Sequence, residues 1–316
     1  MIAIYLHDPR RESFDRARAL VAALGEDARL VTAHPPPLGW SSDWNLLADS
    51  DLRTWVTWLR THSPDTVIVD GPVEHARAVR DLGARLVVIA LPGGRGQAER
   101  GSAYADADLI LAPWPQAAAR GWPEAWRRRT LHLGALGWRS AEVARQVERL
   151  QRAGRSDGAL WHCVALWPTH AGPGPRERRS IAVETPGWRW TYAPEHELLE
   201  PGPVWSHLMR AKVAVCAPSV ATMAALTAFQ VPAVLVLPER PTAAQSFLAE
   251  AAGSTAPVVV AKPSPRPEEW HSLLHAARRL DGRLWKEWSP EPGLAELAEV
   301  LVGREGTAAA DELLNA

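Results

Sequence analysis

The sequence predicts an α/β protein with two doubly wound, Rossmann-like domains, and three observations support this prediction. Short apolar runs of buried-strand length alternate with helical stretches along nearly the whole chain. Within 212–253, two strand–turn–helix units follow one another directly, which favours a parallel sheet. The 316 residues exceed the usual size of one domain and suffice to bury two cores.

The first half of the chain, 1–153, is expected to form the amino-terminal domain. Its segment 34–45 holds three prolines and two tryptophans and is expected to be a loop. Trp55 and Trp58 are expected to share one side of the helix that follows this loop. The expected strands lie at 2–6, 29–33, 66–70, 85–91, 109–112 and 130–133, and the expected helices at 13–24 and 46–61.

The second half, 154–316, is expected to form the carboxyl-terminal domain. A polar amphipathic helix at 139–152 and a short Gly/Ser/Asp segment after it mark the boundary. The expected strands lie at 159–167, 188–192, 213–216, 233–237 and 257–261. The expected helices lie at 220–229, 268–280 and 294–302. Two more are expected, one that begins near 176 and one that follows 238–241 and ends at 252.

The composition excludes several function classes. The formal net charge of -1 and the isoelectric point near 6.8 give no electrostatic reason to expect nucleic acid or an anionic membrane as a partner. The amino terminus lacks a basic segment followed by a long apolar one, and no apolar run reaches membrane-spanning length. A cytoplasmic protein without an integral membrane segment is therefore expected. Sixteen tryptophans leave open a protein partner or a homo-oligomer.

Cysteine and histidine give no sign of a metal site. Cys163 and Cys216 both lie in apolar runs and are expected to be buried free thiols. His162 adjoins Cys163 in a strand, so their side chains face opposite ways and cannot share one metal ion. His271 and His275 have helical i, i+4 spacing, but no acidic or cysteine partner stands nearby.

Ligands are expected at the carboxyl ends of the strands, where open α/β sheets bind them. In the second domain these ends include 217–219 and 238–240. Ser219 has a side chain suited to a helix N-cap, and the N–H groups of the first helical turn could hold a phosphate. The alternative is that Ser219 only caps its helix.

A glycine-containing turn lies earlier in the second half. Gly172 and Gly174 let the backbone approach a diphosphate closely, and Arg176 would add a charge-assisted bond. Pro173 and Pro175 remove N–H donors from the same turn, so a rigid interdomain loop is the alternative.

Three places in the first half are further candidates. His7 could act as a general base oriented by Asp8, or both residues could belong to a surface turn. Asp70 ends a strand and could face the interdomain cleft. In the turn with Gly93, Gly94 and Arg95, the glycines allow unusual backbone angles and close approach of a ligand, and Arg95 would then point into the same cleft; the alternative is a flexible loop.

The segment 212–253 resembles the donor-binding half of GT-B glycosyltransferases. It is most similar to the family that attaches N-acetylglucosamine to lipid-linked muramyl peptide. The resemblance follows the element order of nearly the whole chain and is clearest over 65–115 and 212–253. The phrase Leu111-Ala112-Pro113-Trp114-Pro115 also recurs in predicted actinobacterial-type glycosyltransferases.

The resemblance implies two domains facing a cleft, a UDP-linked nucleotide-diphosphate sugar as substrate, and no other cofactor. In the family a Glu holds the ribose, an Asp/Glu-Gln pair holds the sugar, and a His ends the first turn. These positions fall at Ala225, at Ala244 with Gln245, and at Ser13. The implied donor-binding residues are Gly172, Gly174, Arg176, Ser219, Thr222, Arg240 and Gln245, and the implied catalytic residues are His7, Asp8 and Ser13.

Three functions remain open from the sequence. The first is metal-independent transfer of a sugar from a nucleotide-diphosphate donor to a small-molecule or lipid-linked acceptor. The second is an inactive relative that binds or scaffolds a partner, favoured by the replacements at Ser13, Ala225 and Ala244. The third is hydrolysis of a nucleotide sugar with water as the acceptor.

Overall fold

A computed structural model of the chain describes residues 1–8, 11–37, 40, 43–93, 101–119, 121–137, 160–167, 172–199 and 202–303. Its contacts divide the chain into two compact units. Unit 1 comprises Met1–Leu91, Arg95–Trp138 and Pro290–Ala316, and unit 2 comprises Pro92–Gly94 and Arg139–Ser289. The boundary expected at 153 lies outside the described residues.

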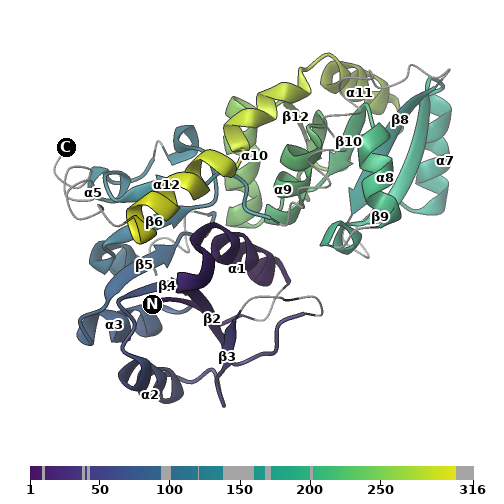
Figure 1. The fold of residues 1–316 in the computed structure, drawn as a ribbon. Helices are drawn as coiled ribbons and strands as arrows, with labels where there is room; N and C mark the ends of the chain where they lie inside the picture. Colours follow the sequence, from purple (N-terminus) through teal and green to yellow (C-terminus); the bar gives the residue numbers. More distant parts are fainter. Residues whose placement is uncertain are drawn as a thin grey trace. The chain divides into compact units, whose positions relative to one another are not determined.

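Unit 1 is built on a seven-stranded parallel sheet with the order β3-β2-β1-β4-β5-β6-β7 (Figure 1). This order, which extends in both directions from β1, is that of a doubly wound Rossmann-like sheet. The strands are β1 Ile2–Leu6, β2 Ala28–Thr32, β3 Trp44–Leu46, β4 Thr66–Asp70, β5 Arg85–Ile89, β6 Leu109–Ala112 and β7 Thr130–His132. The helices are α1 Arg11–Leu24, α2 Leu52–His62, α3 Val73–Asp81, α5 Glu124–Arg127 and α12 Glu291–Val302.

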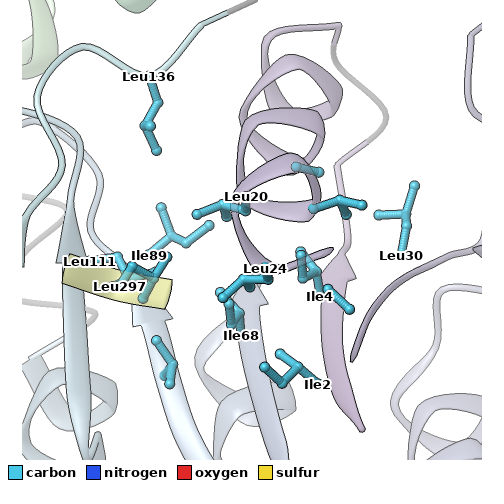
Figure 2. Packing of buried hydrophobic residues seen from close by; sticks show 14 of the residues in the cluster. Ile2, Ile4, Leu20, Leu24, Leu30, Ile68, Ile89, Leu111, Leu136 and Leu297 are labelled. Atoms are coloured by element: carbon cyan, nitrogen blue, oxygen red, sulfur yellow. The ribbon is translucent and has the colours of Figure 1, made fainter. Parts of the chain in front are cut away.

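Helix α1 covers one face of this sheet because its apolar residues recur at helical spacing. Its buried residues include Phe14, Leu20 and Leu24. Figure 2 shows Leu20 and Leu24 among the side chains of Ile4 and Ile68, which come from β1 and β4. The core of unit 1 therefore lies between α1 and the centre of the sheet.

The start of α2 differs from the helix expected at 46–61. The residues Trp44–Leu46 instead form β3, which pairs with β2, and α2 begins only at Leu52. Asp51 is the N-cap, since its carboxylate accepts a hydrogen bond from the backbone N–H of Thr54. The expectation that Trp55 and Trp58 lie on one side of the helix is confirmed, because both are buried.

Helix α12 belongs to unit 1 although it follows all of unit 2 in the sequence. It packs against α1 and β7, and its Leu297 is fully buried in the unit 1 core (Figures 1 and 2). Gly293 allows this close approach, because a Cβ there would overlap the carbonyl oxygen of His132. The sequence-based division at 153 had assigned this helix to the second domain.

Unit 2 is built on a five-stranded parallel sheet with the order β12-β11-β10-β8-β9 (Figure 1). Its strands are β8 Trp161–Trp167, β9 Trp188–Pro194, β10 Val213–Cys216, β11 Ala233–Val236 and β12 Val258–Ala261. Its helices are α7 Pro175–Glu184, α8 Pro203–Arg210, α9 Val220–Phe229, α10 Ala243–Thr255 and α11 Trp270–Arg278. The two parallel sheets confirm the predicted α/β class with two Rossmann-like domains.

The core of unit 2 combines the central strands with aromatic side chains. Val213 and Val215 of β10 pack with Trp188 and Trp270. Both cysteines are buried and unbridged, as expected from their apolar runs. Within the described part of the chain, no helix has the length and apolar character needed to cross a membrane.

Candidate nucleotide-binding site

The carboxyl ends of three strands of unit 2 border a cavity of ≈ 260 Å³. Trp167 ends β8, Ala217 follows β10, and Val236 ends β11. This is the edge at which ligands of open α/β sheets bind. The lining residues are Trp167, Gly172, Pro173, Glu177, Ala217, Val236, Leu237, Pro238, Gln245, Ser264, Pro265 and Trp270.

The chemistry of the walls suits a flat, ring-containing ligand. Trp167 and Trp270 supply aromatic surface, and most other walls are aliphatic. The few polar side chains are those of Glu177, Gln245 and Ser264. A mainly apolar pocket with a small number of polar groups is the usual composition of a small-molecule site.

The two glycines of the predicted diphosphate turn have different surroundings. A Cβ on Gly172 would lie 3.0 Å from Cγ of Trp167, so the backbone there packs directly against the indole. Gly174 is the N-cap of α7, and a Cβ on it would meet nothing within 4 Å. Close backbone approach is therefore required at Gly172, and the group it approaches is the Trp167 ring.

The arginines near this turn lie outside the cavity wall. Arg176 is exposed on α7. Arg178 donates from Nε to the carbonyl oxygen of Pro173 at 2.8 Å, and its guanidinium lies 4.5 Å from the ring centroid of Tyr192. Arg240 is exposed in the loop after β11. None of these three residues lines the cavity.

Ser219 caps α9, as its sequence position predicts. Its hydroxyl oxygen accepts from the N–H of Thr222 at 3.0 Å, and the Thr222 hydroxyl oxygen accepts from the N–H of Ser219 at 2.9 Å. Thr222 is fully buried and donates to the carbonyl oxygen of Ala217. The role of Thr222 in the structure is thus to fix the turn after β10.

A carboxylate of the protein itself lies at this helix N-terminus. The Ser219 hydroxyl donates to the carboxylate of Glu195, the first residue of the 3₁₀ helix Glu195–Leu199 that follows β9. Helix N-termini attract anions, because their N–H groups and dipole favour negative charge. Sequence reasoning missed Glu195, since 24 residues separate it from Ser219.

Gln245 lines the cavity and also caps α10. Its Oε1 accepts from the N–H of Thr242 at 2.9 Å, while its own N–H donates to the Thr242 hydroxyl at 3.2 Å. The side-chain Nε2 of Gln245 has no hydrogen-bond partner among the residues that the structure describes. One end of the amide thus holds the helix and the other is available to a ligand.

In unit 1, the predicted residues Ser13 and Asp70 both accept hydrogen bonds from Arg16. Arg16 donates from Nη2 to Oδ2 of Asp70 at 2.6 Å and to the Ser13 hydroxyl at 3.0 Å. All three side chains are buried. Arg16 was not among the predicted site residues, although it lies one helical turn after Ser13. The ion pair makes Asp70 a structural partner of Arg16 rather than an accessible carboxylate.

His7 and Asp8 follow the carboxyl end of β1. The backbone N–H of His7 donates to the carbonyl oxygen of Asp70 at 3.1 Å. Nδ1 of His7 lies 3.1 Å from the hydroxyl of Tyr5, and the imidazole of His75 is 5.1 Å away between ring centroids. Burial lowers the pKa of His75. The sequence prediction did not include Tyr5 or His75.

The glycine-rich turn after β5 is described only in part. Gly93 has a φ of 120°, a conformation that favours glycine, as the prediction of unusual backbone angles requires. Gly94 and Arg95 lie outside the described residues.

A half-buried histidine, His162, lies near the amino-terminal end of β8. Nε2 of His162 forms a 2.8 Å hydrogen bond with the Thr191 hydroxyl. Burial lowers the pKa of His162 to about 4, with further contributions from the positive charges of His207, Arg189 and Arg210. His162 is therefore neutral in the folded protein near neutral pH.

Comparison with known proteins shows a likeness in structure without one in sequence. No family model and no curated protein matches the chain. MurG from Acinetobacter baumannii is 12% identical with a TM-score of 0.59, and the match covers 100% of this chain and 99% of that one. For CalG4, the calicheamicin glycosyltransferase, the identity is 14%, the TM-score 0.52 and the coverage 99% and 97%.

The UDP-GlcNAc 2-epimerase from Neisseria meningitidis, bound to UDP-GlcNAc, is also similar, with 11% identity, a TM-score of 0.56 and full coverage of both chains. The chain has the GT-B fold. This confirms the fold expected from the resemblance. Since the GT-B fold serves both a transferase and an epimerase here, the reaction must be argued from the site.

Proposed function

We propose that the protein is a metal-independent glycosyltransferase that uses a nucleotide-diphosphate sugar, and that unit 2 binds this donor. The observation that supports the proposal most directly is the cavity at the carboxyl ends of β8, β10 and β11. Nucleotides bind at this edge of doubly wound sheets. A solved structure of similar fold is bound to UDP-GlcNAc, which makes UDP the first nucleotide to test.

Different residues of the cavity would bind different parts of the donor. The apolar faces of Trp167 and Trp270 would hold the base. The carboxylate of Glu177 would accept hydrogen bonds from sugar hydroxyls, a role that Ala225 cannot take, and Nε2 of Gln245 would donate to the sugar. Glu177 is new relative to the donor-binding set expected from the sequence.

The charge of the leaving diphosphate would be balanced by the N-terminus of α9 and by nearby cations. Ser219 and the first-turn N–H groups would serve this purpose once the diphosphate replaced the Glu195 carboxylate. Arg176 and Arg240 are exposed cations on the segments that border the cavity. His7 and Asp8 of unit 1 would serve the acceptor, whereas the Ser13 hydroxyl is buried against Arg16.

Calorimetric titration with UDP, TDP and GDP tests the donor site. We expect micromolar binding of UDP and loss of binding in Glu177→Trp, because the indole would fill the cavity. Arg179→Trp places the same ring on an exposed position of α7 that does not line the cavity, and it should bind as the parent does. If the folded protein binds no nucleotide, the proposal is wrong.

A second assay separates transfer from hydrolysis. The protein is incubated with a UDP-sugar in the presence and absence of candidate acceptors, and released UDP is measured. Release that depends on an acceptor supports glycosyl transfer. Equal release in water alone would instead identify a nucleotide-sugar hydrolase, and tight binding without any release would identify an inactive relative.

A further inference from the structure

Tyr5, near the carboxyl end of β1, holds its hydroxyl 3.1 Å from Nδ1 of His7. The side chain is fully buried, and its ring stacks on Trp55 and His75 with centroids 4.2 and 5.2 Å apart. Gly71 packs close to the contact, because a Cβ there would lie 3.1 Å from the Tyr5 ring and from Cβ of His7. The position of the hydroxyl relative to the imidazole is therefore fixed by packing.

The hydrogen-bonding needs of the phenol decide which atom donates. Burial raises the pKa of Tyr5 well above its usual value, so the phenol keeps its proton. Its partner among the described residues is Nδ1 of His7. If Nδ1 carried a hydrogen and donated to the phenol, the buried phenol proton would lack an acceptor, at a cost of about 1–3 kcal/mol. If the phenol donates and Nδ1 accepts, that cost disappears.

The second neighbour of His7 is the buried imidazole of His75. Nε2 of His75 lies 3.1 Å from the carbonyl oxygen of Ser50, which can only accept, so Nε2 carries the hydrogen. His75 is 3% exposed, and burial together with the nearby His7 lowers its pKa. His7 thus has a neutral imidazole beside it and a phenol at Nδ1.

We propose that Tyr5 is a positioning residue that holds His7 in the tautomer with its hydrogen on Nε2 and with Nδ1 as the acceptor. In that tautomer Nε2 donates a hydrogen bond and cannot take up a proton. The identity of the ligand rests on the glycosyl transfer proposed above. In that reaction Nε2 of His7 would donate a hydrogen bond to an anionic oxygen of the substrate. This role differs from the general base that the sequence suggested.

The tautomer can be measured directly by long-range ¹H–¹⁵N correlation NMR of the ¹⁵N-labelled protein at pH 8. The His7 signals are assigned by their loss in His7→Gln. We expect a protonated Nε2 and an unprotonated Nδ1 in the parent, and mixed tautomers in Tyr5→Phe. Tyr192→Phe removes a buried hydroxyl of unit 2 and should leave the His7 signals unchanged. A protonated Nδ1 in the parent overturns the proposal, even if Tyr5→Phe fails to fold.

Two substitutions at His7 test the consequence for activity. A Gln side chain places an amide N–H near the position of Nε2, whereas Asn places one near Nδ1. If Nε2 acts as a donor, His7→Asn should lose roughly a hundredfold in kcat while His7→Gln keeps most of the rate. Equal losses in both variants would favour a base and refute the donor role. Absence of any transfer would refute the proposed function, while the NMR result would still decide the tautomer.

Discussion

In unit 1 the side chains at the carboxyl edge of the sheet bind one another, whereas in unit 2 the corresponding edge borders a cavity. Arg16 pairs with Asp70 and Ser13 in unit 1, and Tyr5 pairs with His7. In unit 2 the strand ends carry Ala217 and aromatic or aliphatic neighbours around ≈ 260 Å³ of open volume. Both sheets are parallel and doubly wound, so the difference between the two edges comes from the side chains at the strand ends.

The largest expected effect comes from breaking the buried ion pair at the sheet edge of unit 1. Asp70→Asn removes the charge that compensates Arg16 while the guanidinium remains buried. We expect a loss of about 3–5 kcal/mol in unfolding free energy, measured by urea denaturation. Hydrogen exchange should localise the loss of protection to unit 1.

A double substitution controls for the loss of charge itself. Arg16→Met with Asp70→Leu removes both charges, and it should recover much of the stability that Asp70→Asn loses. A cost below 1 kcal/mol for Asp70→Asn, or lost protection in unit 2, would contradict the assigned role of the ion pair.

The next largest effect is destabilisation by acid, to which His162 of unit 2 should contribute. Its folded pKa of about 4 lies below the ordinary value of 6.5, so between these pH values the unfolded chain binds the proton more readily. Stability should be constant above pH 6.5 and should fall as the pH drops towards 4, by about 3 kcal/mol at most. Urea midpoints at several pH values should show this slope, and His162→Gln should make it shallower, while His75 of unit 1, whose pKa burial also lowers, keeps its own contribution. As a control, His271→Gln changes an exposed histidine and should keep the full slope. If His162→Gln also kept the full slope, His162 would not contribute to the pH dependence.

The smallest expected effect concerns the anion at the open edge of unit 2. Glu195→Gln removes the carboxylate that Ser219 holds at the N-terminus of α9. A diphosphate at that helix would no longer meet a like charge, so UDP should bind roughly tenfold more tightly by calorimetry, which corresponds to about 1.4 kcal/mol. Glu197→Gln, an exposed position of the same 3₁₀ helix, should bind UDP as the parent does. Unchanged or weaker binding in Glu195→Gln would place the diphosphate elsewhere.

Local patterns in the sequence were enough for much of the fold. The apolar runs of β1 and β10 and the cap at Ser219 depend on neighbouring residues, and each was predicted. Helix α8 was missed, and the helix expected from 46 begins at Leu52, because Asp51 offers a better cap. These differences arise where competing local signals lie a few residues apart.

The candidate sites were harder to predict, because their contacts join distant parts of the chain. Arg16 and Asp70 are 54 residues apart and meet only because β1 and β4 pair in the register that sets Leu6 opposite Asp70. The contact between Glu195 and Ser219 likewise requires the 3₁₀ helix after β9 to pack against α9. A single sequence gives the residue types but not this register, so Glu195 and Arg16 could not be assigned their partners.

The place of α12 also fixes an order of events during synthesis. Leu297 completes the core of unit 1, yet it leaves the ribosome only after every residue of unit 2. Unit 2 therefore has all of its chain available for folding while unit 1 still lacks one helix. Until α12 docks, the side chains of α1 and β7 that it covers remain in water, and during that interval they are an apolar surface that a chaperone could protect from aggregation.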